Sequence, residues 1–453
     1  MIVLKFGGTS VGDAAAIERA AAITKSRSSR GPVVVVSALA GVTSALLDIA
    51  QRASRGELIV AIRGVEAVRE RHLEVCGSLL GNSSAGGEVE GELSAMCDEL
   101  AGLAEALSVL GHVTPRSLDA IASYGELLSA ALVAAAFRGD HIPVDLIDPR
   151  DVVATDDRFT RATPLFDVIV RQARSTIAPV VERGHVPLLG GFVGRTAQGV
   201  TTTIGRGGGD FSAALVGAAL GASAIEIWTD VDGMLTADPR IVRDARLIEH
   251  IRFDEAAELA SFGAKVLHPS TIAPAVQRGI PVFIFNAKRP SGSGTRVTAD
   301  APIRAVSAIA GKAGVTVVKV RTTRMLLAPG FLRTLFEIFE RHRMSVDVVA
   351  TSEVSVSVTV DDPTHLDGLI VDLRALGDVA IERQRGILAL VGAGLGGSST
   401  TMARALAALG DIRVHMVSLS ATEINLTIIV DSDALPDAMR ALHREFFGAG
   451  DCA

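Results

Sequence analysis

The segment at residues 201–210 holds the side chains with the clearest chemistry, and it reads Thr-Thr-Thr-Ile-Gly-Arg-Gly-Gly-Gly-Asp. The glycines around Arg206 remove side-chain bulk, and a guanidinium can bind a carboxylate through two parallel hydrogen bonds. Asp210 can hold an ammonium group, although it would serve equally well as the N-cap of the apolar helix that follows. An arginine and an aspartate four residues apart therefore favour an α-amino acid as ligand.

A second candidate is Lys5-Phe-Gly-Gly-Thr-Ser10, where the first apolar run ends. Two glycines at a strand-to-helix turn let backbone N–H groups approach an anion, and the helix N-terminus adds positive potential. Lys5 can neutralise phosphate charge at such a turn. The segment is not a Walker A motif, and a tight turn with a surface lysine would explain the same residues.

Two further segments combine charge with a position beside predicted strands. Residues 228–240 hold Asp230, Asp232 and Asp238, and no glutamate closes an EF-hand loop. A loop of this kind can serve a nucleotide and its Mg²⁺, with an acidic, solvated loop as the alternative. In residues 262–269, Lys265 suits a phosphate or nucleotide contact, whereas a histidine before a proline, as at His268, is more often structural.

These candidates need a framework, and the pattern of apolar runs predicts a parallel sheet. Strands at Ile2–Phe6 and residues 33–37 flank a helical stretch, which indicates a right-handed βαβ unit. Further strands are expected at residues 144–147, 186–189, 224–229 and 281–285. Functional loops in such sheets gather at the carboxyl ends of the strands. Residues from about 44 to 132 form helices almost throughout and predict a helical insertion, with a loop at 83–87.

The last third of the chain contains an internal repeat. Residues 351–361 match residues 421–431 at an offset of 70, and each copy reads strand, glycine loop, helix, strand, strand. We expect domains at residues 1–297, 298–383 and 384–453, the last two being α+β modules that can interleave. Residues 392–397 fit the dinucleotide pattern GxGxxG, but too little chain follows, and no acidic residue ends the next strand.

Composition excludes several classes of function. The chain has 453 residues, 48% hydrophobic, with 4% aromatic residues and a net charge of −7, so neither a base-stacking surface nor non-specific nucleic-acid binding is expected. No apolar run approaches the ~20 residues that span a bilayer, and no signal peptide is visible. Three scattered cysteines indicate free thiols in a reducing cytoplasm and give no metal-site spacing.

Taken together, the motifs resemble those of the aspartokinase family, within the broader amino-acid kinases. They occur in the family's order over about 295 residues, and the terminal repeat resembles the paired ACT modules of that family. The segments that carry the resemblance are residues 5–11, Ser37 with 40–43, 123–127, 202–210, 228–233, 238–240 and 262–269.

The resemblance implies an amino-acid-kinase-like parallel-sheet sandwich with a helical insertion, and transfer of phosphate from ATP, with Mg²⁺, to L-aspartate. The catalytic residues it implies are Lys5, Arg206 and Asp210, and no residue is assigned as a metal ligand. The substrate contacts it implies are Ser37, Thr43, Glu126, Arg206, Gly209 and Asp210. The nucleotide contacts it implies are Lys5, Gly7, Gly8, Thr229, Asp230, Leu235, Arg240, Lys265 and Val266. Gly209 and Leu235 depart from the serine and tyrosine common in the family.

The resemblance extends to the effector site of lysine-inhibited members, with Ala328-Pro329 where those members have Ser-Arg. It implies a homodimer or a dimer of dimers, and lysine as effector. The matching effector residues are Met325, Gly330, Phe331, Leu332, Val346, Asp347, Ser352 and Glu353. The alternatives are threonine or no effector, another amino-acid kinase of the same fold, and a non-catalytic amino-acid sensor.

Overall fold

The computed structural model describes residues 1–81, 83–205, 207–262, 271–326, 328–361 and 364–448. The chain folds into two compact units, Met1–Met234 with Leu267–Ala299, and Leu235–Val266 with Asp300–Ala453. The second unit therefore takes a segment from the middle of the chain as well as its last third. The domain boundaries expected from sequence stay a prediction.

The first unit is built on a sheet in the order β3-β4-β2-β1-β7-β9-β10, in which only the β9–β10 pair is antiparallel. All five residues of β2 are buried, which explains why these strands read as continuous apolar runs rather than alternating ones. The strands are β1 (Ile2–Phe6), β2 (Pro32–Val36), β3 (Val144–Ile147), β4 (Val186–Gly190), β7 (Ile225–Thr229), β9 (Val282–Asn286) and β10 (Thr295–Thr298), with β5 (Val193–Arg195) and β6 (Thr201–Thr203) forming a separate ribbon.

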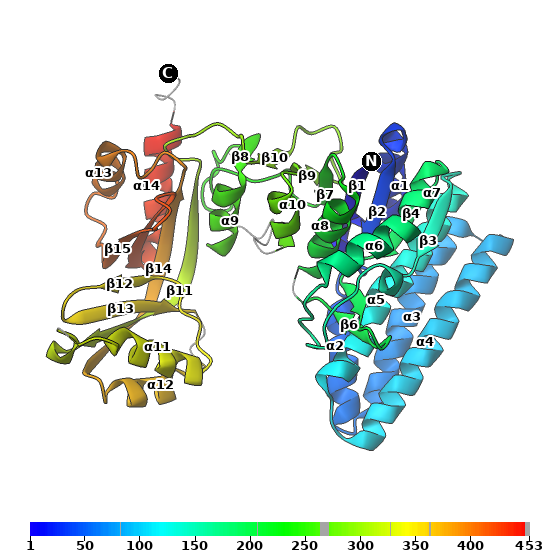
Figure 1. Cartoon of the computed structure of the whole chain (residues 1–453), viewed down its shortest axis with the longest axis horizontal. Helices are drawn as coiled ribbons and strands as arrows, with labels where there is room; N and C mark the ends of the chain where they lie inside the picture. Colours follow the sequence, from blue (N-terminus) through cyan, green and yellow to red (C-terminus); the bar gives the residue numbers. More distant parts are fainter. Residues whose placement is uncertain (82, 206, 263–270, 327, 362–363, 449–453) are drawn as a thin grey trace. The chain divides into compact units, whose positions relative to one another are not determined.

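Helices cover this sheet, and the predicted insertion is a group of four that pack on one another, α3 lying beside α4 (Figure 1). The predicted loop at 83–87 is wrong, because Ser83 caps a helix that starts at Ser84. The helices are α1 (Ala14–Ser26), α2 (Val42–Ser54), α3 (Leu58–Leu80), α4 (Ser84–Leu110), α5 (Pro115–Gly139), α6 (Phe166–Thr176), α7 (Ala178–Glu182), α8 (Gly208–Leu220) and α10 (Ala273–Gln277), with short 3-10 turns such as η1 (Gly8–Ser10).

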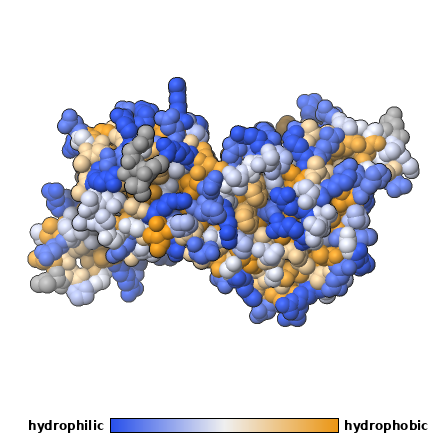
Figure 2. Space-filling model, turned by 90° about the horizontal axis from the view of Figure 1, so that it is seen from above, coloured by the Kyte–Doolittle hydropathy of each residue, from blue (hydrophilic) through white to orange (hydrophobic). Residues whose placement is uncertain are grey.

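Helix α5 is the central helix of the first unit. Among the described residues it is the helix whose length and composition would allow a membrane crossing, yet 83% of its most apolar window is buried. This is the pattern of a core helix, apolar on all sides because it is packed on all sides. On the face drawn in Figure 2, hydrophilic side chains cover much of each unit, with apolar ones scattered between them.

The second unit contains a sheet in the order β12-β13-β11-β14-β16-β15. Its two central strands each have 14 residues and pair antiparallel along most of their length. The strands of this sheet are β11 (Ala308–Arg321), β12 (Val349–Thr351), β13 (Ser355–Val360), β14 (Asp378–Val391), β15 (Met416–Leu419) and β16 (Asn425–Asp431). The unit also contains β8 (His250–Arg252), which is not part of this sheet. The helices are α9 (Phe253–Ser261), α11 (Phe331–Arg341), α12 (Leu366–Leu373), α13 (Ser399–Ala408) and α14 (Leu435–Phe447).

The 70-residue repeat corresponds to two similar modules that share their long strands. Residues 316–321 of β11 pair with β13 in the first copy, while residues 308–313 pair with residues 386–391 of β14, which belong to the second copy. Residues 385–391 of β14 in turn pair with β16. Each central strand therefore contributes to both modules, which physically interleaves them.

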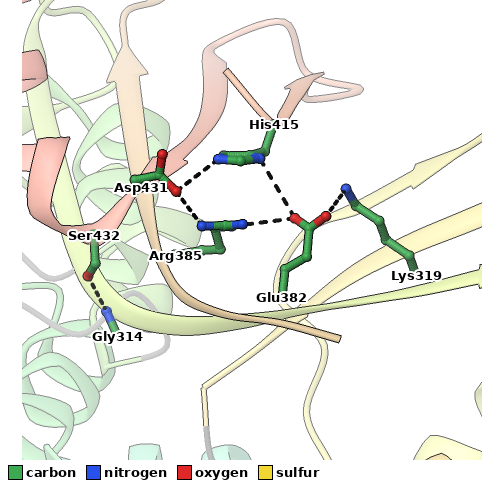
Figure 3. A network of polar contacts seen from close by, with 7 residues as sticks. All are labelled: Gly314, Lys319, Glu382, Arg385, His415, Asp431 and Ser432. Carbon is green, nitrogen blue, oxygen red and sulfur yellow. Dashed lines mark hydrogen bonds and ion pairs between the residues drawn. The ribbon is translucent and has the colours of Figure 1, made fainter. Parts of the chain in front are cut away.

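A polar network marks the junction where the modules meet (Figure 3). Arg385 contacts Asp431 and lies 3.4 Å from Glu382, and His415 lies 3.0 Å from Asp431 and 3.7 Å from Glu382. The backbone changes direction here, since Gly314 of β11 has a φ of 80° and the strand pairing shifts register beside it. The network joins β14 to Asp431, the last residue of β16, near the point where the pairing of β11 with β14 shifts register.

The GxGxxG segment has a packing role in this unit. A Cβ on Gly392 would lie 2.3 Å from the carbonyl oxygen of Ala305. The N–H of Gly394 donates to the carbonyl of Arg304 at 2.8 Å, and the N–H of Ala393 donates to the buried carboxylate of Glu255 at 2.7 Å. The glycines thus permit close backbone contact within the protein, and α9 is joined to the second module through Glu255.

Candidate functional site

A cavity of about 880 Å³ lies in the first unit, at the carboxyl ends of β1 and β2. Its walls come from the turns after these strands, from α5, from the end of β6 and from the first turn of α8. The substrate residues expected from sequence that line it are Ser37, Thr43, Glu126, Gly209 and Asp210. Lys5 and Gly8, expected to contact the nucleotide, line it as well. Arg206 lies outside the described residues.

The turns after β1 and β2 fit closely together. The N–H of Ser37 donates to the carbonyl of Phe6 at 3.1 Å, and the N–H of Ala40 donates to the carbonyl of Gly8 at 3.1 Å. A Cβ on Gly8 would lie 2.8 Å from the carbonyl oxygen of Ala38, so only glycine allows this approach. The glycines of the predicted phosphate turn thus bring two backbone segments together at the rim of the cavity.

Lys5 and Asp210 form an ion pair inside the cavity. Nζ of Lys5 lies 2.7 Å from Oδ1 of Asp210, and the two side chains are only 11% and 16% exposed. Lys5 comes from a central strand, paired with Val35 of β2 and Ile227 of β7, whereas Asp210 lies in the first turn of α8. The sheet therefore holds the cation while the helix start holds the anion.

Close packing against Ser37 and Lys5 explains why position 209 is a glycine. A Cβ there would lie 2.8 Å from Oγ of Ser37 and 3.2 Å from Cε of Lys5. Any larger residue, including the serine common in the family, would require Ser37 or Lys5 to move. This departure therefore matches the tight packing of three predicted site residues.

Glu126 faces the same cavity from α5. Its Oε1 accepts a hydrogen bond from the N–H of Ala38 at 3.3 Å, while Oε2 is buried with no hydrogen-bond partner among the described residues. Burial raises the pKa of Glu126 to about 8, although the N–H of Ala38 and the charge of Lys5 oppose the shift. Glu126 can therefore carry a proton at neutral pH.

Asp119 lines the cavity as well, and the sequence reasoning missed it. It is 1% exposed, and its carboxylate accepts hydrogen bonds from Thr160 and Thr203. The sequence does contain a sign of this residue: Asp119 lies seven residues before Glu126, and this spacing places both carboxylates on one face of α5.

The expected nucleotide residues are divided between the two units. Thr229 and Asp230 lie at the carboxyl end of β7, next to β1, and the N–H of Gly7 donates to the carbonyl of Trp228 at 3.1 Å. Leu235 and Arg240 belong to the second unit, where Arg240 pairs with Asp238 at 2.6 Å and is 88% exposed. Lys265 and Val266 lie outside the described residues.

The expected effector residues surround the start of α11 and the β12–β13 turn. Gly330, with a φ of 89°, precedes Phe331 and Leu332 in the first turn of α11. Met325 and Val346 pack against the same apolar core as Phe331, while Ser352 and Glu353 are exposed in the turn.

Asp347 carries the half-buried carboxylate of this group, and its side chain is 28% exposed. Its carboxylate lies 3.7 Å from Nζ of Lys312, which also contacts Asp361. Burial and the neighbouring Asp361 raise the pKa of Asp347 to about 6.

No cluster of three or more histidine, cysteine, aspartate or glutamate side chains suited to a metal ion occurs in the part of the chain that the structure describes. Mg²⁺ usually keeps several waters and binds through one or two carboxylates together with substrate phosphates. The residues present therefore fit a magnesium ion that arrives with a nucleotide, for which Asp230 offers a carboxylate.

Comparison with known proteins gives a consistent result. Residues 1–286 match the Amino acid kinase family, and residues 388–446 match an ACT domain. The lysine-sensitive aspartokinase 3 of Escherichia coli is 35% identical over 458 residues, covering 99% of each chain. The chloroplastic aspartokinase 3 of Arabidopsis thaliana is 34% identical over 470 residues, covering 99% of this chain and 82% of the relative.

Solved structures agree. Escherichia coli aspartokinase III in complex with aspartate and ADP superimposes with a TM-score of 0.84 at 35% identity, covering 99% of this chain and 100% of the other. The same enzyme in complex with lysine and aspartate also gives a TM-score of 0.84 at 35% identity, covering 99% of each chain.

Proposed function

Since this chain belongs to the aspartokinases of the amino acid kinase family, we propose that it transfers phosphate from ATP to the side-chain carboxylate of L-aspartate, giving 4-phospho-L-aspartate and ADP. The observation that carries this proposal is the cavity that gathers Lys5, Ser37, Glu126 and Asp210 at the carboxyl ends of β1 and β2. Such a site provides opposite charges a short distance apart, as a zwitterionic substrate beside a phosphate requires.

This reaction requires the two substrates to be positioned and the phosphoryl charge to be neutralised, and it does not require a general base. An aspartate side chain is already ionised at neutral pH, so the nucleophile needs no proton removed. The charge on the transferring phosphoryl group is what must be stabilised. Lys5 is suited to this because it extends from a rigid central strand into a cavity that partly excludes water.

Substrate binding would replace one ion pair by two. Lys5 and Asp210 neutralise each other at 2.7 Å. A bound amino acid would bring its ammonium group to Asp210, and the nucleotide would bring its phosphates to Lys5. Each side chain then exchanges its partner without leaving a buried charge unpaired, which would be costly.

Glu126 suits an anionic substrate because burial raises its pKa to about 8. A protonated Glu126 does not repel the two carboxylates of aspartate. Its buried carboxyl group can also donate a hydrogen bond to one of them, a use of a raised pKa seen in other active sites.

The nucleotide would lie at the carboxyl ends of β1 and β7. Lys5, Gly7 and Gly8 would hold its phosphates, and Thr229 and Asp230 lie at the end of the neighbouring strand. Mg²⁺ bound with the nucleotide would neutralise phosphate charge, and Asp230 would provide a carboxylate for it. We also assign Leu235, Arg240, Lys265 and Val266 to this site on the family resemblance.

We propose lysine as a feedback inhibitor acting through the interleaved modules. The relative from Escherichia coli is named lysine-sensitive, and one of its structures contains lysine. The half-buried carboxylate of Asp347 and the exposed Glu353 could hold a cationic ligand. A cytoplasmic location and a homodimer or dimer of dimers complete the proposal. The oligomer is supported by Val349 and Val417, which are 37% and 42% exposed on the edge strands β12 and β15.

A substrate panel tests the proposed reaction. With Mg-ATP and hydroxylamine, the acyl phosphate should be trapped as a hydroxamate from aspartate and not from glutamate. Activity on glutamate alone would instead support another kinase of the same fold, and no activity on any amino acid would support a sensor. Adding lysine or threonine to the same assay identifies the effector, and light scattering gives the number of subunits.

A further inference from the structure

The carboxylate of Asp119 is tied to two other segments of the first unit. Thr203 donates to it twice, from its hydroxyl at 2.6 Å and from its N–H at 3.0 Å. The N–H of Thr160 lies 3.0 Å and 2.9 Å from its two oxygens. Asp119 therefore joins α5 to the end of β6 and to the segment around Thr160.

This pattern gives Asp119 a different role from Glu126, although both are buried on α5 and line the same cavity. Glu126 keeps one oxygen without a hydrogen-bond partner among the described residues, whereas both oxygens of Asp119 are occupied by donors of the protein. Asp119 is therefore suited to hold the cavity wall, while Glu126 is suited to contact a ligand. Burial raises the pKa of Asp119, and the hydrogen bonds from the two threonines oppose that shift.

What Asp119 holds is the start of the glycine-rich segment. Thr203 is the last residue of β6, two residues before Gly205, which adopts a φ of 81°. The chain then continues through residues 206–209 to Asp210 at the start of α8. Fixing Thr203 thus fixes one end of the segment that contains Arg206 and Asp210.

Thr160 is held in a conformation that needs support. Its φ of 69° is unfavourable for a β-branched residue. The adjacent backbone packs on β6, since the N–H of Ala162 donates to the carbonyl of Thr203 at 2.9 Å. A Cβ on Gly205 would lie 3.4 Å from the carbonyl oxygen of Thr160, so this segment also borders the glycine-rich one.

We propose that Asp119 is a positioning residue for aspartate binding: it sets Gly205 and residues 207–210 of the glycine-rich segment against the wall of α5 that carries Glu126. The inference rests on the proposed function, with aspartate as the substrate and Asp210 as one of its contacts. Loss of Asp119 changes the affinity for aspartate, because one wall of the pocket shifts relative to the other. Affinity for ATP changes little, because Lys5, Gly7 and Gly8 are positioned by β1.

Steady-state kinetics of Asp119→Asn test this. Asparagine replaces one carboxylate oxygen by an NH₂ group, which would face a threonine donor and cannot accept its hydrogen bond. At least one charged hydrogen bond is therefore lost, and the KM for aspartate should rise about 10- to 100-fold. The KM for Mg-ATP should stay within about two-fold of the native value, well below that change. Thr203→Val removes only the hydroxyl donor, and it should raise the KM for aspartate about 3- to 10-fold.

The control is Glu226→Gln, which alters another buried carboxylate of the first unit, one paired with Arg27 and Arg30. It should lower the melting temperature and leave the KM for aspartate unchanged. If Asp119→Asn lowers the melting temperature without changing the KM for aspartate, Asp119 is only a stabilising residue and the proposal is wrong.

Equal increases in both KM values would contradict the proposal too. Should Asp119→Asn fail to fold, Thr203→Val decides by the same criterion. If the native enzyme does not phosphorylate aspartate, the proposed function is wrong. If the native enzyme is active but the variants have the native KM for aspartate, only the proposal about Asp119 is wrong.

Discussion

Nζ of Lys5 lies 2.7 Å from Oδ1 of Asp210, although the two residues are more than 200 positions apart in the chain. Strand β1 supplies the cation and the first turn of α8 supplies the anion. The pair is largely shielded from water and borders the cavity with Ser37 and Glu126. Because each partner is suited to a different ligand, removing them one at a time should have different kinetic effects.

Lys5→Ala should lower kcat about 100- to 1000-fold, because a preorganised charge is lost where the phosphoryl group develops negative charge. Asp210→Ala should mainly raise the KM for aspartate, about 10- to 100-fold. Hydroxamate formation at varied aspartate and Mg-ATP measures both effects. Lys25→Ala, at a lysine that is 58% exposed on α1, is the matched control and should leave both constants unchanged. Unchanged kcat in Lys5→Ala would refute its phosphate role.

Gly209→Ala should destabilise the protein by about 1–3 kcal/mol, because its Cβ would lie 2.8 Å from Oγ of Ser37. Denaturant unfolding measures the loss. The double variant Ser37→Ala with Gly209→Ala should recover much of it, since the opposing oxygen is gone. Gly102→Ala is the control: it lies within α4 with open space around its Cβ, and it should stabilise by about 0.5–1 kcal/mol. Additive losses in the double variant would show that the two positions do not clash.

The raised pKa of Glu126 gives aspartate binding a pH dependence. Below about 8 the folded protein keeps the proton, and above it the ionised group repels the substrate carboxylates. The KM for aspartate should therefore rise as the pH passes through this value. Glu126→Gln should have a flatter profile, whereas Glu226→Gln should keep the native one. A native profile that persists in Glu126→Gln would assign the titration to another group.

Glu126 should also affect the stability of the fold as the pH changes. Its pKa is 4.5 in an unperturbed chain and about 8 when folded, so between these values only the folded state binds the proton. The free energy of unfolding therefore falls as pH rises through this window. Denaturant unfolding should show a smaller fall in Glu126→Gln than in the native protein. An equal fall in both would contradict the assignment.

Asp347→Ala should weaken inhibition by lysine at least about ten-fold if its carboxylate binds the effector's ammonium group. The activity without lysine should remain near the native level, because Asp347 belongs to the second unit and is not among the residues that line the cavity. Asp367→Ala, an exposed aspartate on α12 of the same module, is the control and should respond to lysine normally. Equal inhibition of Asp347→Ala and the native enzyme would remove Asp347 from the effector site.

Local sequence patterns predicted much of this fold. The continuous apolar runs of β1 and β2 and the glycines that follow them placed Lys5, Gly8 and Ser37 at one edge of a parallel sheet. The 70-residue repeat likewise predicted two modules of similar element order. The family resemblance predicted that Glu126 and Asp210 share one site, and they line the same cavity.

Other features depend on contacts between distant segments, which a local pattern does not encode. The role of Asp119 depends on Thr203, 84 residues away, and on the strained backbone of Thr160. The sharing of β11 and β14 between modules depends on pairing along 14-residue strands whose apolar pattern is interrupted at the bulge. The need for glycine at 209 appears only when Ser37 and Lys5 are seen beside it.

The most direct test of the central claim is identification, by mass spectrometry, of the hydroxamate formed from L-aspartate, Mg-ATP and hydroxylamine by the purified native chain. We expect aspartate β-hydroxamate with ADP in equal amount, and loss of both products in Lys5→Ala. ADP without hydroxamate, or hydroxamate from glutamate in place of aspartate, would contradict the central claim.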